Sequence, residues 1–254
     1  MRKIKNLFSL KISGFSLLEM AFVLMIMGCV LVVALPFFSS QLHLEQEKKT
    51  TATFESIANH LATHLIQHKR LPCPAAPDAK DEDIGREDLK YCDKAGLIPY
   101  KTLGMSPALT RDGFNHAITF VTHPAFSEKP REWREDDSLS VKKDLFTGDT
   151  SSPQSYCSVK AKAGFKILDE SKNLINEDAY NEPIFVLISH GKNGGDFLSS
   201  GKRRPLAVKD DFKVENSNDD ITFIDAPQTK HCDDRLFWID RYAFAAIYAG
   251  EKCR

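Results

Sequence analysis

The chain lacks several features that would point to common function classes. It has no charge excess, since 34 basic and 35 acidic residues give a net charge of −1, and this balance argues against a general nucleic-acid coat. It has no low-complexity tract and no internal repeat. Ser189-His190 lies outside any G-x-S-x-G elbow, and no glycine-rich strand-to-helix fingerprint for phosphate occurs. We therefore expect that the chain is not an enzyme.

The first 36 residues also lack what an ordinary secretory signal requires. Four basic residues and no acidic residue precede Gly14, and the apolar stretch that follows holds one charge, Glu19. A signal peptide has its small-residue cleavage site after the apolar run, whereas here the small-residue junction Ser13-Gly14 comes before it. Cleavage at that junction would remove the basic leader, keep the apolar segment and leave a net charge of −5.

The uncharged stretch Met20–Phe38 is long enough to cross the ~30 Å bilayer core as a helix. By the positive-inside rule, the basic leader would stay in the cytoplasm and the rest of the chain would lie on the far side. A charged Glu19 would be costly in such a segment unless it had a partner, at roughly 2.5–3.5 kcal/mol. The plain alternative is a single-pass anchor that carries a stray glutamate.

The N-terminus resembles those of type IV prepilins and of type II secretion pseudopilins, residue by residue over about 25 positions. Gly14 matches the residue before the cut, Phe15 the new N-terminus, and Glu19 the fifth mature residue, while Gly28 and Pro36 match the glycine and proline of the first helix. The resemblance implies cleavage after Gly14 and N-methylation of Phe15 by a prepilin peptidase. It also implies that Glu19 pairs with the terminal amine of a neighbouring subunit during assembly.

Beyond residue 38 the sequence predicts an amphipathic helix that is stopped by Pro72 and Pro74. Apolar residues recur at three- and four-residue steps along it, at Phe54, Ile57, Ala58, Leu61, Ala62, Leu65 and Ile66. His60, His64 and His68 follow at four-residue steps on a neighbouring face; this spacing can hold zinc, but a solvated or partly packed face is the simpler interpretation.

The rest of the chain reads as short strands separated by loops, which favours an antiparallel sheet. Strands are expected at 97–103, 116–122, 156–161, 184–189, 221–225 and 236–240. A charge-rich insertion of unknown role covers 128–153. The predicted fold class is α+β and type IV pilin-like, with a long N-terminal transmembrane and amphipathic α-helix packed on an antiparallel β-sheet.

We divide the chain accordingly into three parts. Residues 1–14 are the leader, and 15–70 are the N-terminal helix, spanning the membrane over about 15–38 and amphipathic over 39–70. Residues 71–254 form a periplasmic or extracellular β-sheet domain.

The predicted β-sheet domain resembles a group of minor pilin-like proteins. The shared order is LPCP (71–74), a second cysteine at Cys92, GLIPYKTLG (96–104) and RDGFNHAITF (111–120), although Phe114-Asn115 replaces a Trp-Gly pair and Phe120 a tyrosine. VLISHGKNGG (186–195) and a later acidic pair also match, and either Asp219-Asp220 or Asp233-Asp234 could be that pair.

By this resemblance, Cys73 is expected to be joined to Cys92. A second disulfide could join Cys253 either to Cys232 or to Cys157, and the sequence does not choose between these two pairings. Cys29 lies in the predicted membrane helix.

In major pseudopilins a comparable loop and acidic pair hold calcium, which takes six to eight oxygen ligands. The weak calcium candidates here are Ser189, Asn193, Asp219 and Asp220. The alternative is that the glycines only let a surface loop turn through positive φ. No cofactor is expected.

The leading hypothesis is a minor pilin or pseudopilin, a structural subunit of a type IV pilus or type II secretion filament. The expected partners are a prepilin peptidase, other pilins or pseudopilins, the inner-membrane assembly platform and the membrane itself. The expected location is the bacterial inner membrane, single-pass, with the C-terminal domain in the periplasm or in a cell-surface filament.

The alternative is a non-assembling single-pass envelope protein whose β domain binds a ligand or partner. A DNA-uptake pilin that uses the basic run 202–204, and an enzyme, rank below both, so nucleic acid is not an expected partner.

Overall fold

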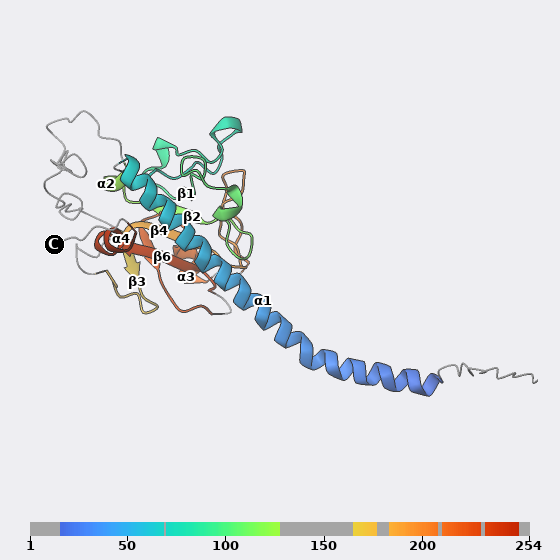
Figure 1. Ribbon diagram of the computed structural model, residues 1–254. Coiled ribbons are helices and arrows are strands. Elements are labelled where there is room, and N and C mark those ends of the chain that lie inside the picture. Colours follow the sequence, from blue (N-terminus) through green and yellow to red (C-terminus); the bar gives the residue numbers. More distant parts are fainter. Residues whose placement is uncertain are drawn as a thin grey trace, which may run out of the picture. The chain divides into compact units, whose positions relative to one another are not determined.

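The computed structural model describes residues 16–68, 70–127, 165–176, 183–207, 210–229 and 232–248. The chain divides into two compact units, 1–45 and 46–254, and each is described by itself. The predicted insertion at 128–153 and the expected strand at 156–161 lie outside the described residues. Figure 1 labels most of the helices and strands and colours the chain along the sequence.

The longest element is α1, Leu17–His68. Pro72 and Pro74 follow its end, in agreement with their inability to continue a helix. In the second unit, α1 buries the predicted stripe except for Ile66, which is 50% exposed. Ile57, Ala58 and Leu61 are fully inaccessible to solvent. The three- and four-residue spacing of this stripe brings its members to one face of the helix.

The expectation of a membrane-spanning segment over about 15–38 is wrong. Among the described residues, no helix combines the length and the apolar character that crossing a membrane requires. A span needs about 20 consecutive apolar residues, and the described stretch of exposed apolar side chains, 17–32, is shorter and contains Glu19. This finding corrects both the predicted fold class, in its transmembrane pilin-like form, and the predicted single-pass inner-membrane location. An α+β architecture with a sheet remains.

The central sheet has four strands in the order β1-β2-β4-β6, all antiparallel. The strands are β1 Gly96–Leu97, β2 Thr119–Thr122, β4 Pro183–Ser189 and β6 Arg235–Asp240. Every residue of β4 is buried, because β4 lies between β2 and β6 and both faces of the sheet are covered. The expected strand over 97–103 is mostly wrong, since turns begin at Tyr100.

Different elements cover the two faces of the sheet. The second half of α1 packs on one face, where it shares a core with Phe120, Phe185 and Leu187. On the other face, Val186 and Ile188 pack with residues of β3, Lys166–Leu168, and β5, Thr222–Ile224. These two short strands pair in parallel, so the expectation of a purely antiparallel domain holds only for the four-stranded sheet.

Short helices lie before, between and after the strands. They are the 3₁₀ turns η1 Asp81–Asp83, η2 Leu89–Tyr91 and η3 Pro107–Thr110, and the α-helices α2 Pro124–Ser127, α3 Asp211–Glu215 and α4 Arg241–Tyr248. Phe244 of α4 is fully buried and meets Phe185 edge to face at 5.5 Å. The helix after the last strand thus closes the same core that α1 covers.

The loop before β2 is fixed against α1 through Gly113. Its backbone N–H donates to Thr50 Oγ1 at 3.0 Å, and a Cβ on Gly113 would overlap the backbone of Gln46. We expect Gly113→Ala to destabilise the domain by about 1–3 kcal/mol, because backbone must move to admit the methyl group. Chemical denaturation measures the loss.

Gly28→Ala is the matched control, since a Cβ at Gly28 meets no atom within 4 Å. Replacing glycine by alanine in a helix interior does not lower the stability of the helix. Equal stability of the two variants would contradict the close contact between the loop and α1.

Candidate functional site

The first unit exposes a continuous run of large apolar side chains on α1. Leu17 is 93% exposed and Leu24 65%. The others are Leu18, Met20, Phe22, Val23, Met25, Ile26, Met27, Val30, Leu31 and Val32. We call residues 17–32 the apolar segment. Exposed apolar surface on this scale marks an interaction site rather than ordinary scatter.

The residues of the prepilin-like motif are described only in part. Gly14 and Phe15 lie outside the described residues, and so does the side chain of Pro36, although α1 continues through that position. Gly28 lies within the apolar segment with open space where a side chain would be.

Glu19 has a local partner at the start of α1. The Ser16 backbone N–H donates to Glu19 Oε2 at 2.9 Å, and the Glu19 N–H donates to Ser16 Oγ at 3.2 Å. This reciprocal pair is a capping box, which satisfies backbone donors that a helix end leaves free. Glu19 is exposed, so its carboxylate has a structural use that sequence reasoning missed, although Ser16-x-x-Glu19 is the signature of a capping box.

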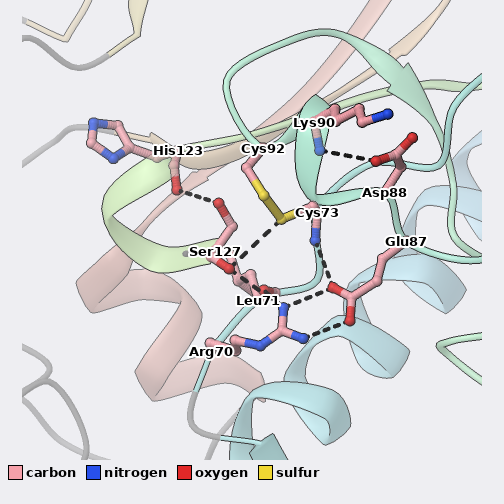
Figure 2. Close-up of a disulfide and its surroundings, with 9 residues drawn as sticks. All are labelled: Arg70, Leu71, Cys73, Glu87, Asp88, Lys90, Cys92, His123 and Ser127. Carbon is pink, nitrogen blue, oxygen red and sulfur yellow. Dashed lines mark hydrogen bonds and ion pairs between the residues drawn. A yellow bond between two sulfur atoms is a disulfide. The ribbon is translucent and has the colours of Figure 1, made fainter. Parts of the chain in front are cut away.

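The expected disulfide between Cys73 and Cys92 is confirmed, with the two Cα atoms 4.5 Å apart. Figure 2 shows it beside the end of α1, where Cys73 Sγ lies 3.7 Å from the Ser127 carbonyl oxygen. Both cysteines are buried. The bridge closes the loop that leads from α1 towards β1.

A partly buried ion pair supports the same loop. The Arg70 guanidinium binds both carboxylate oxygens of Glu87, at 2.5 and 2.7 Å, and Glu87 Oε2 also accepts the Cys73 N–H at 3.2 Å. Burial opposes ionisation of Glu87, but the hydrogen bond and charge of Arg70 outweigh it and hold the pKa of this carboxyl below its ordinary value. The carboxylate thus ties Arg70 to Cys73.

The cysteines considered for a second bridge are described in part. Cys232 is a buried free cysteine, and burial raises the pKa of its thiol to about 11. Cys157 and Cys253 lie outside the described residues. Cys29 is exposed and free.

Each weak calcium candidate has another partner. Ser189 Oγ donates to Asp112 Oδ2 at 2.7 Å, and Asn193 is held through its backbone N–H by Asp233 at 3.1 Å. Asp219 pairs with Arg203, and Asp220 accepts from Thr222 N–H at 2.7 Å. In the described ranges, no group of three His, Cys, Asp or Glu side chains could hold a metal ion.

The acidic pair beside the glycine loop 190–195 is Asp233-Asp234 rather than Asp219-Asp220. Asp233 Oδ2 accepts the Lys192 N–H at 2.6 Å, and the Lys213 ammonium contacts both carboxylates. Sequence reasoning missed Lys213, because no local pattern links a lysine of a short helix to carboxylates 20 and 21 residues further along.

Asp112, within the RDGFNH motif, is a fully buried carboxylate. Its Oδ1 accepts the N–H groups of Phe114 and His116 at 2.9 and 2.8 Å, while Ser189 donates to Oδ2. Burial raises its pKa despite these bonds. Asn115 adopts φ +65°, a conformation that asparagine tolerates.

The basic run 202–204 is largely committed to internal contacts. The Arg203 guanidinium pairs with Asp219 and lies 3.8 Å from the centre of the Phe197 ring. Arg204 pairs with Asp196 at 2.7 Å. Each arginine of the run thus has its charge balanced by a carboxylate of the same chain. This leaves less positive charge to attract DNA and weakens the DNA-uptake interpretation.

The histidines of α1 do not share one environment. His64 is buried, with Nδ1 3.1 Å from the Arg70 carbonyl oxygen, and its ring centre lies 4.3 Å from that of His68. His60 Nδ1 instead lies 2.8 Å from the Ser56 carbonyl oxygen. These contacts favour a partly packed face over a zinc site.

Comparison of the chain with protein-family models, with curated proteins and with solved structures gave no match.

Proposed function

We propose that the chain is a structural subunit of a filament of the type IV pilus or type II secretion kind, a minor pilin or pseudopilin, with no catalytic role. The apolar segment of α1 is its assembly surface, and the same segment of other pilins or pseudopilins covers it. A prepilin peptidase cuts after Gly14 and methylates Phe15. The exposure of residues 17–32 is the observation that carries this proposal.

The exposed surface needs a partner because its burial is strongly favourable. Burying apolar area contributes roughly 25 cal/mol per Å², and the β-sheet domain has its own core against the second half of α1. The apolar segment contributes nothing to that core among the described residues. Helix-to-helix packing between subunits would give it a buried environment.

Glu19 has two candidate roles, as the cap of α1 and as the charged partner of a neighbouring subunit's terminal amine. Substitution by glutamine distinguishes the two roles. Glutamine at the same position preserves a capping box, because its side-chain oxygen still accepts the Ser16 N–H. It cannot form an ion pair with the cationic amine of a neighbour. The charge of Glu19 and its helix cap are therefore tested by different substitutions.

We expect both Glu19→Gln and Glu19→Ala to be processed and excluded from filaments, because each leaves a neighbour's buried amine without its counter-charge, typically a loss of about 3–5 kcal/mol. The variants are expressed in cells that contain the chain's own peptidase and companion subunits. Intact mass reports loss of 14 residues and gain of one methyl group, and sheared filaments are assayed for the chain.

Glu55→Gln is the matched control, since Glu55 is another exposed carboxylate of α1, and it should assemble normally. If Glu19→Gln assembles and Glu19→Ala does not, the glutamate serves only as a cap. A wild-type chain that keeps its first 14 residues and is absent from filaments would overturn the proposal and favour an independent binding protein.

A further inference from the structure

Lys213 is a buried cation surrounded by oxygen atoms. It lies on α3, its side chain is 0% exposed, and its ammonium donates to the His190 carbonyl oxygen at 2.9 Å. It also donates to Asp233 Oδ1 at 2.6 Å and to Asp234 Oδ1 at 2.5 Å. An ammonium has three protons, so these three oxygens use its full donor capacity.

The same carboxylates hold the surrounding backbone with their other oxygens. Asp233 Oδ2 accepts the N–H groups of Lys192 and Asn193 in the glycine loop, at 2.6 and 3.1 Å. Asp234 Oδ2 accepts from Asn216 Nδ2 at 3.2 Å. The ammonium therefore lies where the glycine loop, α3 and the chain entering β6 meet.

The glycine loop approaches these carboxylates too closely for a side chain. Gly191 has φ +58°, and a Cβ there would lie 2.5 Å from Asp233 Cγ. The loop is thus shaped to bring backbone N–H groups and a carbonyl oxygen to the acidic pair. Such a group of carboxylate and carbonyl oxygens is what a hard cation binds.

The charges favour the ionised state of the cluster. Burial lowers the affinity of Lys213 for its proton, but Asp234 and Asp233 outweigh that effect and raise its pKa. Burial likewise opposes ionisation of Asp234, and His190 and Lys213 outweigh it, so its pKa is lowered. Two carboxylates face one ammonium, with His190 Nδ1 3.7 Å from Asp234 Oδ2.

We propose that this cluster is an internal cation site in which Lys213 takes the place of a bound divalent metal ion. The ammonium supplies the positive charge that Asp233 and Asp234 require, so the fold of the glycine loop is independent of calcium in the natural chain. Removal of the lysine side chain leaves an empty space lined by the carboxylates of Asp233 and Asp234 and by the His190 carbonyl oxygen. A calcium ion fits that space, with these oxygens and water molecules as its ligands.

The test compares thermal unfolding of the full chain in EDTA and in 0.1–20 mM calcium chloride, a range chosen around roughly millimolar affinity for a site with few anionic ligands. In EDTA, Lys213→Ala should unfold about 10 °C below wild type, because unpaired buried carboxylates are strongly destabilising. Its midpoint should rise with the logarithm of the calcium concentration. Adding Asp233→Asn should abolish that rise.

Two matched variants isolate the cause. Lys192→Ala removes an exposed lysine from the same loop and should match wild type, with no response to calcium. Lys213→Met removes the charge but keeps the volume filled, so it should be unstable in EDTA and should not be rescued. The proposal would be overturned if Lys213→Met were as stable as wild type in EDTA. It would equally be overturned if Lys213→Ala gained no stability in 20 mM calcium, or gained no more than wild type does.

Discussion

Replacing both bridge cysteines, Cys73→Ala with Cys92→Ala, is expected to lower the free energy of unfolding by about 3 kcal/mol. The bridge joins residues 19 positions apart, and closing a loop of that length removes about 3 kcal/mol of entropy from the unfolded chain in the chain-entropy model. The effect should be larger than that of most single substitutions. Urea denaturation monitored by tryptophan fluorescence measures it.

The control for this effect is Cys232→Ala, which removes a buried cysteine that forms no bridge. It should lose only the packing of one small side chain. Treating the wild-type chain with a thiol reductant should reproduce most of the loss, whereas the response of the double variant should be much smaller. A double variant as stable as Cys232→Ala would mean that Arg70 and Glu87 hold the loop without the disulfide.

Sequence reasoning succeeded where a local pattern determines the structure. The spacing of Phe54, Ile57 and Leu61 places them on one helical face whatever they pack against, so the buried side of α1 could be predicted. The pairing of Cys73 with Cys92 came from a resemblance and was confirmed. The expected strand at 184–189 overlaps β4, whose uninterrupted apolar run is typical of a strand buried on both faces.

Long-range geometry explains what the sequence did not reveal. The parallel pairing of β3 with β5 joins strands of three residues, which are too short to show a period. The choice of Asp233-Asp234 over Asp219-Asp220 depends on the position of Lys213, which only the folded chain defines. The membrane-spanning prediction over about 15–38 relied on the length of the uncharged stretch, on the basic leader and on the resemblance of the N-terminus, and the described helix does not meet the requirement.

Mild acid is expected to destabilise the β-sheet domain through His123. This histidine follows β2 and is 5% exposed, and its ring meets Phe126 and Phe165 edge to face, with ring centres 5.7 Å apart in each pair. Burial lowers its pKa from 6.5 to about 4. Between these values the unfolded chain binds a proton that the folded chain does not, so stability is complete above pH 6.5 and falls as the pH decreases.

The linkage relation gives a loss of about 2 kcal/mol between pH 8 and pH 5. The measurement is the free energy of unfolding in urea at half-unit steps of pH. His123→Phe, which offers its neighbours a ring that cannot titrate, should flatten most of this dependence. A smaller slope should remain, because burial also lowers the pKa of His64. The carboxylates with lowered pKa, Glu87, Asp169 and Asp234, lose their contribution only in stronger acid. A His123→Phe profile as steep as that of wild type above pH 5 would therefore show that His123 is not the group responsible.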